Sequence, residues 1–265
     1  MIKALINNQW ESIPEENLQL GATTFSYETG LYETFRTLDF KPVFLQAHLN
    51  RLFKSAQKIN LNISYSQSSI LEMLLKVIHD FPDPNQRVRI LAVPNKLILY
   101  TSHLNLDSII YDGVSVMTVK AFRDNPELKT TQYHACLNAW KTANDAGCFE
   151  AILMDEDGLL FEGSRSNLFW VINGIIFTRK GDVLPGITRQ TIINQSPFPI
   201  DYGLLNISEI RNIDECFLTN SGSGIIPVRQ INDELIGNGT IGPITKQLLP
   251  IYHQWMVQDL KGDSI

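Results

Sequence analysis

The chain has 265 residues, of which 22 are Lys or Arg and 28 are Asp or Glu, so its formal net charge is −6. A surface that follows a phosphate backbone needs an excess of basic residues, and no basic run here is longer than Arg179-Lys180. This composition argues against nucleic-acid binding as the main function. The hydrophobic share of 44% is typical of globular proteins, and at roughly 150 residues per domain the length suits one or two domains.

Other classes of protein are disfavoured by what the sequence lacks. No apolar stretch approaches the ~18 residues of a membrane-spanning helix, and the N-terminal segment has no apolar core typical of a secretory signal. The cysteines Cys136, Cys148 and Cys216 form no CxxC pair, and the histidines show no metal-ligand spacing. We therefore expect a cytoplasmic protein with buried thiols and no metal site.

The first part of the chain predicts an α+β domain over residues 1–115. A hairpin is expected over residues 1–10 with its turn at Asn7-Asn8, followed by a strand at Leu31–Leu38. From Leu45 onward, apolar residues recur at helical spacing. The remaining expected elements are helices at Gln46–Lys58 and Ile70–Ile78, then a hairpin of Arg87–Val93 with Leu97–Thr101 around Pro94-Asn95.

The second part predicts a β-rich domain over residues 126–265, joined to the first by a linker at 116–125. A strand at Val114–Val119 precedes a helix at Thr131–Ala146, which Gly147 would end. The strongest hairpin signal is Asn173-Gly174. The expected elements around and after it are strands at Ala151–Asp155, Leu159–Glu162, Leu168–Ile172 and Ile175–Phe177, and helices that begin at Thr188, Ser208 and Ile241.

Common catalytic signatures are absent, including the GxSxG nucleophile turn, the GxxxxGK[ST] phosphate loop and the GxGxxG dinucleotide motif. What remains is a set of polar residues beside apolar segments. Taken singly, each is explained as a solvated or turn residue. The set comprises Glu33, Arg51, Lys129, Glu162, Gly186–Arg189 and Thr219–Ser221.

Four segments that carry these residues occur in the order found in one enzyme family. They are GLYETFRT (30–37) with FLQAHLNRLFKSA (44–56), LKTTQY (128–133) with AGCFEAILMDEDGLLFEGSRSNLFW (146–170), VLPGITRQTII (183–193), and ECFLTNSGSGIIPV (215–228). On these motifs the chain resembles the class IV pyridoxal-phosphate (PLP) enzymes. That family includes branched-chain aminotransferases, D-amino-acid aminotransferases and aminodeoxychorismate lyases. The resemblance implies an α+β, two-domain fold of PLP fold type IV, a PLP site between the domains, and a homodimer.

The resemblance also implies roles for several residues of the set. Lys129 would form the Schiff base with the cofactor aldehyde and then move the proton at the amino-bearing carbon. Glu162 would contact the pyridine nitrogen and keep it protonated, so that the ring can accept electrons. The phosphate would bind at a helix start, where unpaired N–H groups and the helix dipole favour an anion. Its donors would be Arg51, Ile187, Thr188 and Ser221.

The motifs indicate the enzyme family more clearly than the reaction that this protein catalyses. We expect a lyase that converts 4-amino-4-deoxychorismate to 4-aminobenzoate and pyruvate in folate biosynthesis, because FLTNS, with Asn220, and GLYETFRT resemble the lyase forms. In such a lyase, Asn220 or Tyr32 would lie near the leaving enolpyruvyl group. No arginine stands at the end of the strand Arg87–Val93, where aminotransferases of the family bind the substrate carboxylate.

Two alternative functions and the role of one residue stay open. One is an aminotransferase for branched-chain or D-amino acids with 2-oxoglutarate, in which Tyr32 would contact the carboxylate. Another is a protein of this fold that binds a ligand without chemistry, which the retention of Lys129, Glu162 and Arg51 disfavours. For Tyr133, a place near the ring hydroxyl and simple core packing explain the residue equally well.

Overall fold

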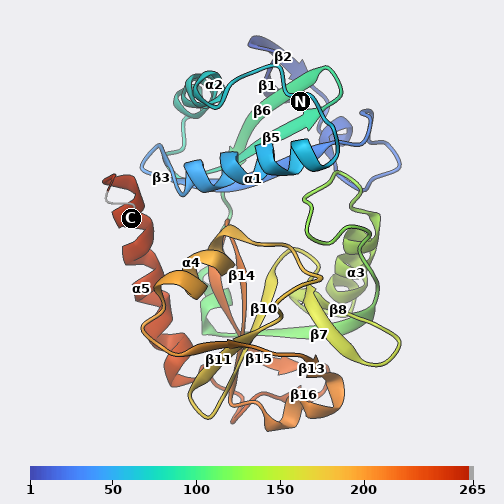
Figure 1. Cartoon of the computed structure of the whole chain (residues 1–265), viewed down its shortest axis with the longest axis vertical. Coiled ribbons are helices and arrows are strands. Elements are labelled where there is room, and N and C mark those ends of the chain that lie inside the picture. The colour runs from blue at the N-terminus through green and yellow to red at the C-terminus, as the bar shows by residue number, and fades with distance from the viewer. Residues whose placement is uncertain (263–265) are drawn as a thin grey trace. The chain divides into compact units, whose positions relative to one another are not determined.

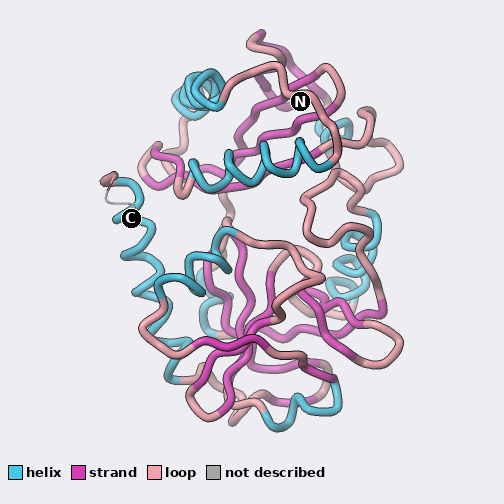
Figure 2. The backbone as a smooth tube through the Cα atoms, in the orientation of Figure 1, coloured by secondary structure: helices cyan, strands magenta, loops and turns pink. Residues whose placement is uncertain are grey.

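The computed structural model describes residues 1–262, which form two compact units (Figure 1, Figure 2). The first unit contains Met1–Asn105, Leu128–His134 and residues 256–262. The second contains Leu106–Glu127 and Ala135–Trp255. The observed division differs from the expected domains at four places. Residues 106–115 belong to the second unit, and the described residues from Met256 belong to the first. The predicted linker at 116–125 contributes to a strand of the second unit, and residues 128–134 belong with the first.

The first unit is built on an antiparallel sheet with the strand order β2-β1-β6-β5-β3-β4. Two α-helices and a short 3₁₀ helix accompany it. The elements are β1 (Ile2–Ile6), β2 (Gln9–Ile13), the 3₁₀ helix η1 (Glu15–Leu18), β3 (Leu31–Leu38), β4 (Lys41–Pro42), α1 (Leu45–Lys58), α2 (Gln67–Asp80), β5 (Gln86–Val93) and β6 (Lys96–His103).

Local sequence signals explain most of these elements. Asn7 and Asn8 both have positive φ angles, 48° and 67°, as the tight turn between β1 and β2 requires. Helix α2 begins earlier than expected because Ser66 caps it: its side chain accepts a hydrogen bond from the N–H of Ser69 at 3.1 Å. The predicted hairpins and helices of this unit are confirmed, with ends shifted by a few residues.

Alternation along the strands gives the first sheet two distinct faces. One face carries residues such as Phe35 and Ile90, which pack with Leu52 of α1 and Leu74 of α2 in the main core. On β3, Tyr32 instead joins a second cluster with Leu91, Tyr100 and other buried apolar residues. The side chains of neighbouring residues on β3 therefore enter different environments.

The second unit contains a mixed sheet with the order β12-β11-β10-β14-β15-β7-β8-β9-β13, and β16 pairs with β15. The pairs β7·β8, β7·β15 and β11·β12 are parallel. The strands are β7 (Val114–Lys120), β8 (Glu150–Met154), β9 (Leu159–Gly163), β10 (Asn167–Ile172), β11 (Ile175–Thr178), β12 (Ile200–Tyr202), β13 (Leu205–Asn206), β14 (Glu215–Asn220), β15 (Gly224–Ile231) and β16 (Glu234–Leu235).

Helices complete the chain, and none among residues 1–262 is long and apolar enough to cross a membrane. They are α3 (His134–Asp145), α4 (Ile187–Gln195), α5 (Pro243–Leu260) and the 3₁₀ helices η2 (Ser108–Asp112) and η3 (Ile207–Asn212). The predicted helix at Thr131–Ala146 starts too early. Residues 129–131 pair instead with the start of β3, where Tyr32 N–H donates to the Lys129 carbonyl at 3.0 Å and Thr131 N–H to that of Gly30 at 2.9 Å. These ladder bonds hold Lys129 in an extended segment rather than at a helix entrance.

Candidate active site

The residues predicted for the site fall into two sets, one in each unit. The first unit carries Lys129, Tyr32, Tyr133 and Arg51, and the second carries Glu162, Ile187, Thr188, Asn220 and Ser221. Within each set, the contacts described below connect several of the predicted residues.

The ring of Tyr32 is the centre of the first set. The Lys129 amine, Nζ, lies 4.5 Å from the ring centroid, and the Tyr133 ring meets it edge to face at 6.1 Å between centroids. Tyr32 is 7% exposed, whereas Lys129 is half-buried. An ammonium group over an aromatic face is stabilised by the electron-rich ring, so this contact orients the amine.

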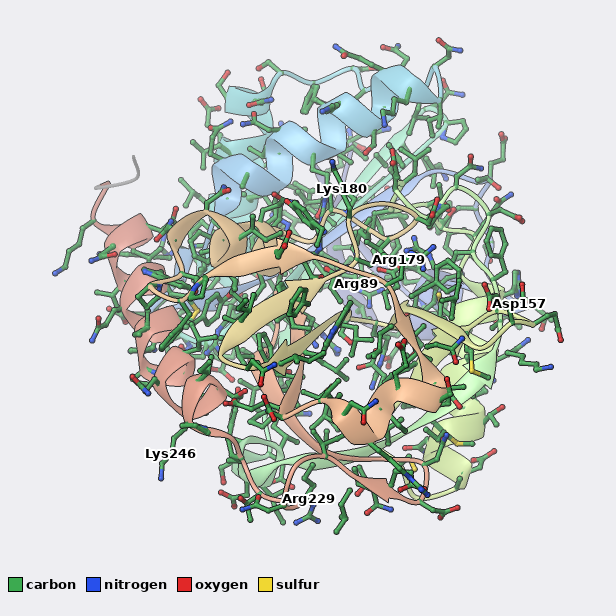
Figure 3. All side chains as sticks on the ribbon, turned by 60° about the horizontal axis from the view of Figure 1, so that its bottom comes forward. Arg89, Asp157, Arg179, Lys180, Arg229 and Lys246 are labelled. Carbon is green, nitrogen blue, oxygen red and sulfur yellow. The ribbon has the colours of Figure 1, made fainter. Side chains whose placement is uncertain are left out.

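An arginine that the sequence analysis missed joins this group. The Arg89 guanidinium carbon lies 5.7 Å from the centroid of the same Tyr32 ring; Figure 3 labels the residue. Arg89 pairs with Thr34 in the antiparallel ladder, which makes it a diagonal neighbour of Tyr32 on one sheet face. As expected, no arginine stands at the end of β5. Arg89 lies instead in the middle of the strand.

Arg51 is held by Glu33, a residue of the first unit that had no predicted role in the site, and Glu33 is in turn held by His48. Its Nε donates to Glu33 Oε1 at 2.8 Å and its Nη2 to Glu33 Oε2 at 2.5 Å. His48, one helical turn before Arg51, places Nδ1 2.8 Å from Glu33 Oε2. The Glu33 side chain is 1% exposed and that of Arg51 is 9% exposed, so this is a buried ion pair that fixes the guanidinium.

Burial and charge set the ionisation of these groups. Burial alone would raise the pKa of Glu33, but the charges and hydrogen bonds of Arg51 and His48 outweigh it and hold that pKa at about 2. Burial lowers the pKa of His48, although Glu33 opposes this effect. A neutral His48 must donate from Nδ1 to the carboxylate, which leaves Nε2 as an acceptor. That atom is buried and has no partner among the described residues.

In the second unit, Glu162 at the end of β9 is held by several donors. Arg123 forms an ion pair with Oε1, while the Asn167 side-chain amide and the Leu184 N–H each donate to Oε2 at 3.0 Å. Glu162 is 3% exposed. These contacts fix the direction of the carboxylate.

The turn after Glu162 depends on a second buried carboxylate, Glu150 of β8. Its Oε1 accepts from the Arg165 N–H at 2.5 Å and from the Ser166 hydroxyl at 3.0 Å. A Cβ on Gly163 would lie 2.6 Å from this oxygen, so the turn admits only glycine there. Burial raises the pKa of Glu150. Glu150 thus stabilises the turn that directly follows Glu162.

The start of helix α4 offers an anion-binding arrangement. Its N-cap residue is Gly186, which has no side chain to bind the first N–H groups of the helix, and the next residues, Ile187 and Thr188, are buried. Among residues 1–262, the N–H groups of Ile187 and Thr188 have no acceptor. The Thr188 hydroxyl lies 3.1 Å from the hydroxyl of Tyr252.

Ser221 begins the turn that follows β14. The side chain of Asn220 stabilises this turn, since its Oδ1 accepts hydrogen bonds from the N–H groups of Gly222 at 3.0 Å and Ser223 at 2.8 Å. Asn220 therefore has a structural task in the turn. Thr219, just before it, is 1% exposed and has a hydroxyl without a partner among the described residues.

These donors suit PLP. Unpaired N–H groups at a helix start and nearby hydroxyls fit a phosphate ester, a fixed carboxylate fits a protonated ring nitrogen, and a lysine amine fits an aldehyde. The orphaned hydroxyl of Thr219 is a further sign of polar groups that lack a protein partner. The arrangement in each unit thus agrees with the predicted cofactor chemistry.

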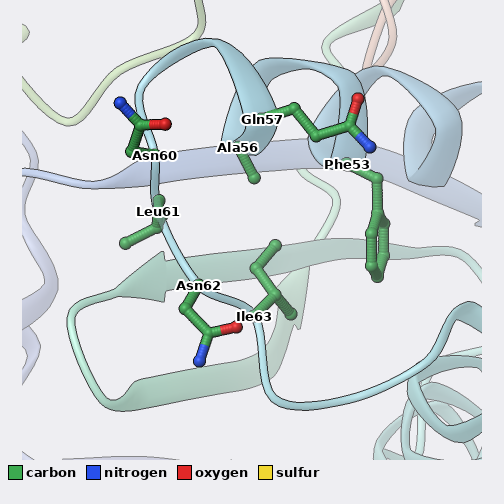
Figure 4. Close-up of a pocket in the computed structure, with 7 residues that line it drawn as sticks. All are labelled: Phe53, Ala56, Gln57, Asn60, Leu61, Asn62 and Ile63. Carbon is green, nitrogen blue, oxygen red and sulfur yellow. The ribbon is translucent and has the colours of Figure 1, made fainter.

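One surface pocket lies away from these residues. It has a volume of about 450 Å³ and lies where α1 ends, as Figure 4 shows. No predicted site residue lines it. The lining residues are Phe53, Ala56, Gln57, Asn60, Leu61, Asn62 and Ile63.

Comparison with known proteins identifies the class. Residues 30–231 match the family model for amino-transferase class IV, which includes all four sequence motifs. The chain belongs to this family of PLP-dependent enzymes.

Individual relatives include more than one activity. The chain is 28% identical to the branched-chain-amino-acid aminotransferase of Pseudomonas aeruginosa over 259 residues, covering 86% of this chain and 84% of the relative. It is 25% identical to the D-alanine aminotransferase of Listeria monocytogenes over 284 residues, covering 98% and 96%. It is also 28% identical to the aminodeoxychorismate lyase of Bacillus subtilis over 254 residues, covering 86% of each.

Solved structures confirm the predicted fold class. The structure superposes on the branched-chain amino acid aminotransferase of Escherichia coli with a TM-score of 0.83 and 23% identity, covering 96% of this chain and 94% of that one. The α+β, two-domain architecture of class IV aminotransferases is therefore the fold of this protein.

Proposed function

We propose that this protein is an aminotransferase that moves the amino group of a branched-chain amino acid to 2-oxoglutarate. The observation that carries the proposal is the placement of Arg89 and Lys129 on one ring, that of Tyr32. An aminotransferase must hold a bare carboxylate beside the carbon at which the proton moves. Arg89 supplies a guanidinium for it, Lys129 an amine for the proton, and Tyr32 a hydroxyl.

Arg89 is well suited to this task because it has no competing anion. Within residues 1–262 no carboxylate forms an ion pair with it. Arg87, two residues earlier on β5, is exposed and donates to Ser102 instead. A half-buried, unpaired guanidinium binds a carboxylate more strongly than a solvated one does, because it has already lost part of its hydration.

The remaining residues would hold the cofactor, which supplies an electron sink when bound. Glu162 would keep the proton on the pyridine nitrogen, and Tyr133 would lie near the ring hydroxyl. The phosphate would be bound by Arg51, by the N–H groups of Ile187 and Thr188, and by the hydroxyls of Thr188 and Ser221. The two hydrogen bonds from Arg51 to Glu33 would fix the direction of the guanidinium before the cofactor arrives, and His48 would in turn hold Glu33.

The lyase remains the second candidate. Its support is the FLTNS segment and the 28% identity to an aminodeoxychorismate lyase, which equals that to the branched-chain enzyme of Pseudomonas aeruginosa. Against it, Asn220 uses its side-chain oxygen within its own turn, and this local task explains the residue without a substrate. Arg89 also removes the objection that an aminotransferase would lack an arginine for the carboxylate.

The experiment supplies purified holoenzyme with L-leucine, L-valine or D-alanine, each with 2-oxoglutarate, and follows glutamate. A parallel arm supplies aminodeoxychorismate, generated by its synthase, and follows 4-aminobenzoate and pyruvate. Glutamate from the branched-chain substrates supports the proposal. Fast 4-aminobenzoate release with no glutamate would replace it with the lyase, and preference for D-alanine would change the substrate class.

We also infer, from family resemblance, that the protein works as a homodimer in the cytoplasm. The chain mass is 30.0 kDa, so light scattering on the purified protein should give twice this value. A mass of one chain under assay conditions would contradict the dimer.

A further inference from the structure

Tyr252 of helix α5 contacts both segments to which we assign the cofactor phosphate. Its hydroxyl lies 3.1 Å from the Thr188 hydroxyl at the start of α4. Its ring lies against Gly224, which follows the Ser221 turn; a Cβ there would be 2.7 Å from the Tyr252 Cε1 atom. Tyr252 is 4% exposed, so the phenol is enclosed between the two segments. The family match ends at residue 231 and assigns α5 no role.

The start of α5 is fixed by a buried carboxylate. Glu215, the first residue of β14, accepts hydrogen bonds from the N–H groups of Ile244 at 2.9 Å and Thr245 at 2.7 Å. A negative charge at a helix start is favourable, and it satisfies two N–H groups that the helix leaves unpaired. Gly242 permits this approach, since a Cβ there would lie 2.0 Å from Glu215 Cδ.

Strand β14 connects the residue that holds the start of α5 to the turn at Ser221, which we assign to the phosphate. Glu215 at one end of β14 holds the start of α5, and the other end leads through Asn220 to Ser221. Tyr252, further along α5, then returns to Thr188 and Gly224. One side chain, that of Tyr252 on α5, thus contacts both the start of α4 and the end of the Ser221 turn.

We propose that Tyr252 is a positioning residue of the phosphate site, whose hydroxyl donates to Thr188 Oγ1 and directs the threonine proton toward the phosphate. The inference rests on the proposed assignment of the phosphate to Thr188. A hydroxyl has one proton and two lone pairs, so the pair can be arranged in either direction. With an anion nearby, the arrangement in which Tyr252 donates is favoured, because the opposite one would turn lone pairs of Thr188 toward negative charge. A donor that itself accepts a hydrogen bond is also the stronger donor.

The test compares Tyr252→Phe with the wild-type protein in the binding of PLP and of pyridoxal, which lacks the phosphate. Phenylalanine keeps the ring against Gly224 and removes only the hydroxyl. We expect PLP to bind roughly tenfold more weakly, as for the loss of one hydrogen bond to a charged group, with unchanged binding of pyridoxal. Tyr202→Phe, at an exposed tyrosine of the same unit, is the matched control and should change neither.

Thr188 variants complete the experiment. Thr188→Val should weaken PLP binding and make a further Tyr252→Phe change nearly silent, whereas Thr188→Ser should retain most of the affinity. Equal weakening of PLP and pyridoxal by Tyr252→Phe, or additive losses in the double variant, would overturn the inference. A loss with Thr188→Val but none with Tyr252→Phe would overturn it while leaving the phosphate assignment intact. Unchanged PLP binding in Thr188→Val would remove the phosphate assignment and the inference together, without bearing on the substrate.

Discussion

Glu33 of β3 and Arg51 of α1 form a two-contact ion pair that is almost completely buried, with Arg51 Nε 2.8 Å from Glu33 Oε1 and Nη2 2.5 Å from Oε2. A pair of this kind gives little net stability compared with apolar residues, but breaking it leaves a buried charge without a partner. The ion pair mainly orients the Arg51 guanidinium, which we assign to the phosphate.

Replacing Glu33 by Gln should destabilise the protein by about 3–5 kcal/mol, since Arg51 would keep its charge in a buried site. The free energy of unfolding in urea measures the loss. Glu234→Gln is the control, because Glu234 forms an exposed two-contact pair with Arg211. Exposed pairs contribute little, so the control should unfold at nearly the wild-type urea concentration. Equal losses in both variants would contradict the account of the buried pair.

The same pair predicts an acid dependence of stability. The pKa of Glu33 is about 2 in the folded protein, below its ordinary 4.5. Between these values the unfolded chain binds the proton and the folded chain does not, so the contribution of Glu33 is full above about pH 4.5 and is lost as the pH falls toward 2. Urea unfolding over this range should show a shallower pH dependence in Glu33→Gln than in the wild type. Parallel curves would show that Glu33 titrates normally.

Arg89→Ala should lower kcat/KM for the amino acid and for 2-oxoglutarate by roughly ten- to a hundredfold, the effect of losing a charge-assisted hydrogen bond. PLP affinity should be unchanged, because Arg89 is assigned to the substrate. Steady-state kinetics and a cofactor titration measure the two effects. Arg87→Ala, two residues away on the same strand, should be close to wild type. If Arg87→Ala had the larger effect, or if Arg89→Ala lost PLP, the carboxylate assignment would be wrong.

Glu162→Gln should bind PLP nearly as well as the wild type and lose orders of magnitude in kcat, because an amide does not keep the ring nitrogen protonated. Glu156→Gln, at an exposed residue paired with Lys120, is the control for a change of charge in the same unit. Stopped-flow rates with L-leucine would separate the chemical step from binding. A Glu162→Gln enzyme with wild-type kcat would refute the assignment.

Much of the fold could be predicted from the sequence, because its signals are local. The Asn7-Asn8 and Asn173-Gly174 turns need positive φ angles that asparagine and glycine accept, and α1 shows its apolar spacing directly. The helix predicted from Thr131 failed because hydrogen bonds to Gly30 and Tyr32, remote in sequence, override local preference. No local pattern indicates such pairing.

The candidate site shows the same division. Motif order predicted site residues such as Lys129 and Glu162, but not the partners that contact them. Arg89 became visible only through the register of β3 against β5, and Tyr252 only through the packing of α5. For Arg89 a usable signal existed: antiparallel pairing of the Leu31–Leu38 and Arg87–Val93 segments brings alternate residues to one face. For Tyr252 the sequence offers none.

The most direct measurement is a single half-reaction on purified holoenzyme. L-Leucine is added without any keto acid, and the bound cofactor and the leucine-derived keto acid are quantified by mass spectrometry. We expect PLP to become pyridoxamine phosphate with one keto acid formed per subunit, and Lys129→Ala, which lacks the proton-moving amine, to form none. Wild-type enzyme that kept its PLP unchanged with L-leucine, yet released 4-aminobenzoate and pyruvate from aminodeoxychorismate, would contradict the account.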